Sequence, residues 1–131
     1  MKTSELQRAA LDWAVAIALG HDKQDIITDF GVYIRIKTQP AGTLTFCPST
    51  DWAQGGPIIE REKIGVWWAT PCVDDDGVEY GNHWYAEMEC TDDNADKPYR
   101  VAIGPTPLIA AMRCYVVNKL GDEIELPEEL K

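Results

Sequence analysis

GPTPLIAAMRCYVVNKLG, residues 104–121, predicts one complete helix whose two ends are both encoded. Thr106 suits the N-cap, where its hydroxyl can accept from a free backbone N–H, and Pro107 suits the first helical position. Gly121 suits the C-cap, where a positive φ is common. Arg113 is the one polar residue in the apolar run that follows Pro107, so we expect this helix to lie against the core. The residues expected to face that core are Ile109, Met112, Val116 and Leu120.

A second helix is predicted near the start of the chain. Ser4 and Gln7 have the spacing of a capping box, which marks a helix start. Apolar residues then recur at three- and four-residue steps up to Gly20, namely Leu6, Ala10, Trp13, Ala14 and Ile17. We expect an amphipathic helix that packs on the same core.

Several segments alternate apolar and polar side chains, as half-buried strands do. They are residues 32–37, 43–46, 64–68, 84–90 and 99–103. Alternation implies that one face of the sheet is buried and the other meets solvent. The predicted fold class is therefore α+β, an antiparallel sheet of about five strands with the N- and C-terminal helices packed on one face.

The composition indicates a single domain, residues 1–131. A chain of 131 residues can fold without a disulfide or a metal. The formal charge of −10, with no local basic patch, disfavours direct binding to nucleic acid or to a membrane surface. The four cysteines form no C-x-x-C pair, and neither a targeting segment nor a membrane span is recognisable. We expect a cytoplasmic protein with reduced thiols.

No sequence pattern predicts a metal, a cofactor or a catalytic centre. Residues 74–77 and 91–97 are acidic but lack the ligand spacing of an EF-hand loop, so we interpret both as solvated turns. The histidines and cysteines are too dispersed for a metal site. The standard catalytic signatures are absent, so we expect a protein that is not an enzyme.

The segment STDWAQGGPIIER, residues 49–61, is the candidate ligand site. Its two glycines allow close backbone approach, and Pro57 can open a short helix whose free N–H groups would face an anion or carboxylate. The alternative is structural. In that interpretation Asp51 caps a turn, Trp52 fills the core, and Arg61 is a surface charge.

Arg113 presents the same choice. It is either a structural partner of a carboxylate such as Asp51 or Glu60, or a cation that faces a ligand. The candidate ligand-binding residues are Asp51, Trp52, Gln54, Gly55, Gly56, Arg61, Thr106 and Arg113.

The outer face of the predicted sheet carries three aromatic residues, Tyr33, Trp67 and Tyr85. A solvated sheet face usually shows less apolar surface than this, so we expect a cover. Either residues 57–62 or the acidic tail covers it, or a second subunit does. Mixed charges beside aromatic rings suit a self-complementary patch, which favours a homodimer or a higher homo-oligomer.

Two distinctive stretches carry a family resemblance, PSTDWAQGGPIIERE and GPTPLIAAMRCYV, and they are joined by KTSELQ and ALDWAVA near the start and KLGDEIELPEEL near the end. Together these stretches resemble the NinX-like family of small lambdoid bacteriophage proteins. More loosely, the last strand and its Thr-Pro helix resemble a phage α/β/α sandwich domain. The resemblance implies a protein that works in the cytoplasm of an infected bacterium, and it assigns no activity. A sandwich would cover both sheet faces, whereas strand alternation predicts one.

These features lead to two hypotheses of function. The first is a non-enzymatic phage accessory protein that binds a small polar, nucleotide-like ligand between residues 52–61 and the start of the C-terminal helix, and so sequesters a host defence signal. The alternative is an acidic protein-interaction module that engages a host protein.

Overall fold

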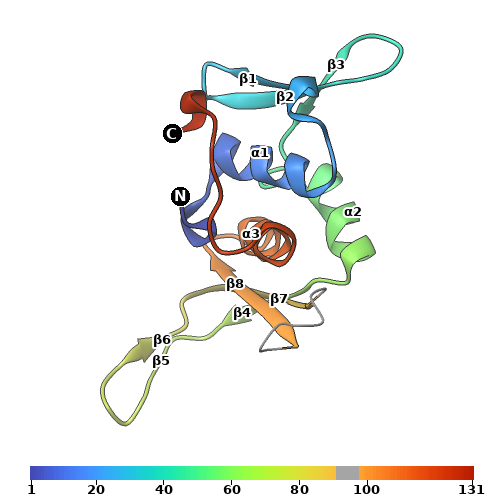
Figure 1. Ribbon diagram of the computed structural model, residues 1–131. Coiled ribbons are helices and arrows are strands. Elements are labelled where there is room, and N and C mark those ends of the chain that lie inside the picture. The colour runs from blue at the N-terminus through green and yellow to red at the C-terminus, as the bar shows by residue number, and fades with distance from the viewer. Residues whose placement is uncertain (91–97) are drawn as a thin grey trace.

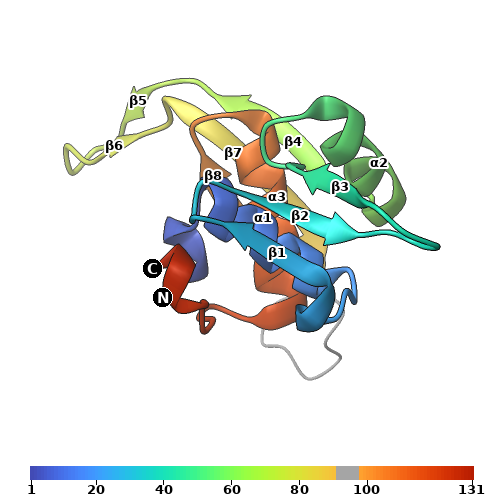
Figure 2. The ribbon, with the colours of Figure 1, turned by 90° about the horizontal axis from the view of Figure 1, so that it is seen from above.

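The computed structural model describes residues 1–90 and 98–131, and two antiparallel sheets enclose two helices (Figures 1 and 2). Helix α1 (Arg8–Ala18) and helix α3 (Pro107–Leu120) pack against each other, and each also covers one sheet. The layers therefore run sheet, helix, helix, sheet, and one apolar core spans them.

The first sheet has the strand order β1-β2-β3, and the second has the order β4-β7-β8. The strands are β1 Ile26–Asp29, β2 Tyr33–Lys37, β3 Thr43–Phe46, β4 Gly65–Ala69, β5 Cys72–Val73, β6 Glu79–Tyr80, β7 His83–Glu89 and β8 Tyr99–Gly104. Strands β5 and β6 form a hairpin that projects beyond the second sheet (Figure 1). Helix α2 (Trp52–Glu62) carries the chain from the first sheet to the second. Short 3-10 helices occupy Thr3–Glu5 (η1), Lys23–Asp25 (η2) and Glu128–Leu130 (η3).

The predicted α+β class and the antiparallel pairing are confirmed, but the strands do not form one sheet with both helices on it. They divide into two sheets because a helix, and not a tight turn, follows β3. Each sheet then receives one helix on its inner face. The sequence pattern does not predict strand β1, because Ile26 and Ile27 are only a short apolar pair in a polar segment.

Helix α3 has both of the predicted ends. The Thr106 hydroxyl accepts from the N–H of Ile109 at 3.1 Å, Pro107 occupies the first turn, and Gly121 ends the helix with a φ of 92°. The buried set is wider than the predicted stripe and comprises Leu108, Ala110, Ala111, Met112, Cys114, Tyr115, Val116 and Asn118. The reason is the layering: α1 covers one side of α3, and the second sheet covers the other.

The predicted capping box at Ser4 and Gln7 is wrong. Helix α1 begins at Arg8, and Gln7 is its N-cap without a side-chain hydrogen bond. The preceding residues are fixed elsewhere, because the N–H of Thr3 donates to Asp122 O at 2.8 Å and its hydroxyl donates to Gly121 O at 2.7 Å. The N-terminus is thus attached to the end of α3, and the first helix starts only after this attachment.

Candidate functional site

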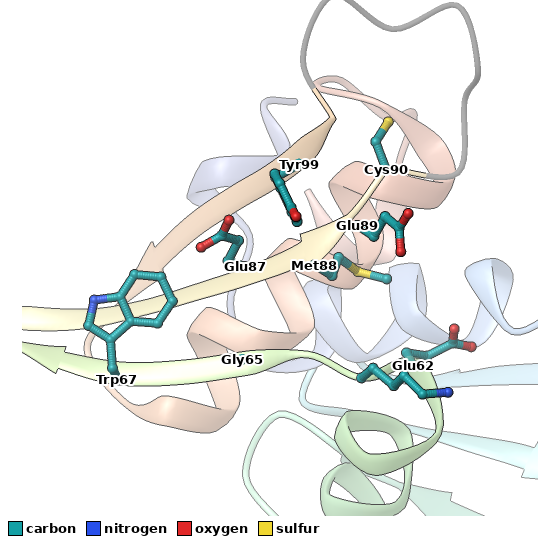
Figure 3. Close-up of a pocket in the computed structure, with 9 residues that line it drawn as sticks. Glu62, Gly65, Trp67, Glu87, Met88, Glu89, Cys90 and Tyr99 are labelled. Carbon is teal, nitrogen blue, oxygen red and sulfur yellow. The ribbon is translucent and has the colours of Figure 1, made fainter.

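A groove of about 590 Å³ extends from the second sheet to the end of α2 (Figure 3). Its lining residues are Glu62, Lys63, Gly65, Trp67, Glu87, Met88, Glu89, Cys90 and Tyr99. We call it the acidic-aromatic groove. Figure 3 shows that three adjacent strands and the C-terminal end of α2 contribute to it.

The strand register brings the main lining residues to one face. Gly65 of β4 lies opposite Glu87 of β7, and Trp67 follows Gly65 by two residues. Glu89 lies opposite Tyr99 of β8. Because side chains alternate between the faces of a sheet, these positions share the face that α3 does not cover.

Gly65 keeps the groove open along β4. A Cβ added at this position would meet only the carbonyl oxygen of Glu87, at 3.8 Å. The space above it is therefore free, and a larger side chain would project into the groove. The φ of Gly65 is not positive, so the backbone conformation does not require a glycine here. The role of this glycine is instead to leave the space above it open.

The aromatic wall is held by stacking. The rings of Trp67 and Tyr85 lie 5.7 Å apart with an interplanar angle of 9°, and the ring of His83 lies 4.8 Å from that of Tyr85. Trp67 is nevertheless 42% exposed and Tyr99 is 52% exposed. Two aromatic side chains of the groove are therefore accessible to a ligand, and one of them is fixed in orientation.

Carboxylates dominate the charge of the groove. Glu62, Glu87 and Glu89 line it, with Lys63 as the basic lining residue. Glu62 is paired with Arg61 at 3.3 Å, whereas the ion pairs of the described residues include neither Glu87 nor Glu89.

The charge of Glu87 also affects the thiol of Cys114, which lies on α3 at the other face of the sheet. Burial, together with the charge of Glu87, raises the pKa of the Cys114 thiol on α3 to about 12. Burial thus favours the neutral thiol form of Cys114 in the core.

Unpaired carboxylates beside exposed aromatic rings suit an ammonium or guanidinium group, which binds to both. Among the described residues, no cluster of His, Cys, Asp and Glu could hold a metal ion. The described helices also include none that is long and apolar enough to cross a membrane.

Comparison with protein families identifies the chain. A family model described as Bacteriophage P22, NinX matches residues 2–119. The chain belongs to this family. The resemblance drawn from the sequence motifs is thereby confirmed, and the NinX match includes the strands of the groove. A comparison with curated protein sequences found no match.

Two of the predicted ligand-binding residues have structural roles on α2. Asp51 is the N-cap, and its carboxylate accepts from the N–H of Ala53 at 3.0 Å. Gln54 accepts from the N–H of Cys47 at 2.8 Å and donates to Thr45 O at 2.9 Å. These contacts attach the start of α2 to the end of β3.

The two glycines and Pro57 lie inside α2 and not before it, so the prediction that Pro57 opens a short helix is wrong. Gly55 is needed for close packing, because an added Cβ would lie 2.6 Å from a methyl carbon of Leu108. Gly56 faces open space. Trp52 is 57% exposed, which contradicts the alternative in which it fills the core.

Arg113 pairs with neither Asp51 nor Glu60. It donates through Nε to Leu6 O at 2.8 Å and through Nη1 to Ile103 O at 3.0 Å, and burial lowers its pKa. It lines a second cavity of about 380 Å³, which we call the β8 cavity. The other lining residues are Lys2, Thr3, Ser4, Val101, Ala102, Ile103, Val117, Asp122 and Glu123.

The predicted ligand-binding residues therefore do not converge on a single cavity. Arg113 lines the β8 cavity, Thr106 caps α3, and Arg61 is exposed beside Glu62. Neither the β8 cavity nor the acidic-aromatic groove includes a residue of the predicted 51–61 set. Ligand binding by that set stays a prediction.

The predicted oligomer surface is divided between the two sheets. Trp67 and Tyr85 are stacked on the second sheet, but Tyr33 lies on β2 of the first. The three aromatic residues cannot form one patch, because the chain builds two sheets where the pattern suggested one. Sequence reasoning places Glu87 and Glu89 on an outer face but does not identify them as a site, since their neighbours Gly65 and Tyr99 are known only from the register.

Proposed function

We propose that this phage protein is an interaction module, and not an enzyme, that binds a basic segment of a protein partner in the acidic-aromatic groove. The observation that carries the proposal is that Glu87 and Glu89, which form no ion pair with another described residue, lie beside the exposed rings of Trp67 and Tyr99. Because the chain belongs to a bacteriophage family, we propose that the partner is a protein of the infected bacterium and that they meet in its cytoplasm.

Both local contacts and the whole charge support this choice. A cation over an exposed aromatic ring contributes about 0.5–1 kcal/mol, and charged hydrogen bonds to the carboxylates add to it. The formal charge of −10 attracts a basic partner from a distance and speeds its association at low salt. The same charge repels phosphate groups.

The nucleotide-like ligand of the first hypothesis has less support. Asp51 and Gln54 already use their polar atoms in hydrogen bonds within the chain, and Arg113 is directed to two backbone carbonyls. The groove, in contrast, offers two carboxylates that form no ion pair within the described part of the chain. The acidic interaction module is therefore the function we favour.

Calorimetric titration with a short arginine-rich peptide tests the proposal. The same peptide with citrulline in place of arginine keeps the shape and removes the charge. We expect binding to the first and not to the second, with affinity falling between about 50 and about 300 mM salt because the attraction is screened. Spermine is a further probe, since tighter binding of this polyamine than of the peptide would contradict a protein partner.

The double variant Glu87→Gln, Glu89→Gln identifies the site. It should weaken binding of the arginine peptide about tenfold, which corresponds to roughly 1.4 kcal/mol. The control is Asp75→Asn, Asp76→Asn, which removes the same charge from the exposed tip of the β5-β6 hairpin. Equal weakening in both double variants would show nonspecific attraction and would overturn the assignment of the groove.

A further inference from the structure

Strand β8 is an edge strand of the second sheet. It pairs with β7 on one side, and no other strand in the described part of the chain pairs with it. Pro98 O accepts from the N–H of Cys90 at 2.7 Å, so the backbone at position 98 faces the β7 side. Ile103 O accepts from Arg113, so the backbone at position 103 faces away. Even positions of β8 therefore pair with β7, and odd positions turn their backbone groups to the edge, where Ile103 O is already occupied by Arg113.

The side chains at these odd positions are apolar. Tyr99 and Val101 are each 52% exposed, and Ile103 is 45% exposed, all on the outer face of the sheet. Proteins usually protect an edge strand with a proline, a charged side chain or a bulge. The charged residue of β8 is Arg100 on the inner face, so the outer row of Tyr99, Val101 and Ile103 carries no charge. An edge with an uncharged apolar row can serve as a template for another strand.

We propose that two copies of this chain pair antiparallel through β8, about a twofold axis at Val101. The two copies of the second sheet then form one continuous sheet. Val101 lies opposite its own copy, and Tyr99 lies opposite Ile103 of the second copy. Pairs of β-branched residues, and of aromatic with β-branched residues, are favourable across antiparallel strands. The backbone groups at the odd positions become the hydrogen bonds of the interface, and Ile103 O accepts a second hydrogen bond beside the one from Arg113.

The inner face of β8 fits the same register. Arg100 lies opposite Ala102 of the second copy, so no like charges meet across the strands. A register centred on Arg100 would place two guanidinium groups opposite each other, which is unfavourable. The sequence of the strand thus favours one self-pairing over its neighbour.

Local charge explains why a chain with a formal charge of −10 would associate at this edge. The β8 cavity beside the edge is lined by Lys2 and Arg113 as well as by Asp122 and Glu123, so its charge is close to balanced. The carboxylates of the groove lie on β7 and α2 and not on β8 itself, with Glu87 one strand in from the edge, opposite Val101. Repulsion between the more distant charges is screened beyond about 8 Å at physiological ionic strength.

The dimer would place the two acidic-aromatic grooves on one continuous outer face. A partner with two basic segments could then occupy both grooves, and the second contact would be intramolecular. The sequence predicts a homo-oligomer that forms through a face shared by Tyr33, Trp67 and Tyr85. We place the contact between the copies at the edge of β8 instead.

Light scattering and sedimentation over about 1–100 µM, a range in which dimers of moderate affinity dissociate, test this inference. We expect a mass approaching twice the chain mass of 14.6 kDa at the upper concentrations. Val101→Pro removes one N–H at the free edge and leaves the β7 hydrogen bonds in place, so it should give a folded monomer. Val101→Lys retains every backbone donor and sets two ammonium groups opposite each other, so it should also be monomeric.

The matched control is Val66→Pro on β4, the other edge of this sheet. Ala69 O accepts from the N–H of Asn82 at 2.8 Å, which places the backbone of position 69 on the β7 side and that of position 66 at the free edge. This variant should remain dimeric, with its folding checked by circular dichroism. A wild-type monomer at the highest concentration, or a dimer that persists in Val101→Lys, would overturn the proposal.

Discussion

The two sheets are built alike and yet present different outer faces. In the first sheet, Arg35 on β2 forms hydrogen bonds to the Asp29 carboxylate through Nε and Nη2 and to the Thr43 hydroxyl through Nη1. The pairing lowers the pKa of Asp29 and raises that of Arg35. In the second sheet, Glu87 and Glu89 stand beside aromatic rings without an ion pair among the described residues.

The two sheets therefore differ in whether their outer charged residues already have a partner within the chain. A charged residue on a sheet face that already has its partner contributes to the folded state and offers little to a ligand. A carboxylate without a partner is solvated in the free protein and can bind a cation from outside. The proposed binding site therefore lies on the second sheet, whereas the first sheet packs against α1.

The largest effect is expected where the chain passes from one sheet to the other. Gly55→Ala would place a Cβ 2.4 Å from Pro48 O, so α2 must move, and we expect a loss of about 3 kcal/mol in the free energy of unfolding. Chemical denaturation measures it. Gly56→Ala is the control, because no atom lies within 4 Å of its added Cβ and alanine favours a helix. Equal losses in both variants would contradict the packing role of Gly55.

A smaller effect concerns Asp12 on α1, on the side of the first sheet. This carboxyl is 5% exposed, accepts from the N–H of Ser49 at 2.9 Å, and has its pKa raised by burial from 3.8 to about 6. Because the folded-state pKa is the higher one, the stabilisation from protonated Asp12 is complete below about pH 4 and is lost as the pH rises through about 6.

Asp12→Asn keeps an oxygen that can accept from Ser49 and removes this titration. Near pH 7.5 we expect the variant to be more stable than the wild type by on the order of 2 kcal/mol, with little difference near pH 4. Denaturant unfolding at both pH values measures the change. Asp75→Asn at the exposed hairpin is the control and should show no such difference. A gain that is equal at both pH values would contradict the ionisation of Asp12 as its cause.

The smallest effect tests the contrast between the faces directly. Trp67→Ala removes an exposed ring of the groove and should weaken binding of the arginine-rich peptide about fivefold, or roughly 1 kcal/mol. Tyr33→Ala removes a similarly exposed ring from the first sheet and should leave the affinity unchanged. Calorimetry compares them. Equal weakening would show that the peptide does not distinguish the two faces.

Part of the fold is readable from local sequence. The ends of α3 follow from Thr106, Pro107 and Gly121, since capping depends on residues only a few positions apart. The alternation in β7 likewise places Glu87 and Glu89 on the outer face, because successive side chains of a strand point to opposite faces. Neither inference needs knowledge of a distant residue.

The division into two sheets and the composition of the site are tertiary properties. Ser4 and Gln7 have a capping spacing, but the attachment of Thr3 to the end of α3 decides where α1 begins. The sequence likewise gave no sign that Arg113 binds Leu6 O and Ile103 O, two backbone carbonyls far from it in the chain.

The sequence by itself therefore determined the α+β class, the family and the ends of α3, because each depends on a local pattern of residues. Only the tertiary structure decided that Gly65 lies opposite Glu87, and that Glu89 lies opposite Tyr99. A strand's register and its neighbours are set by the packing of whole layers, so the groove that they form cannot be read from any one segment.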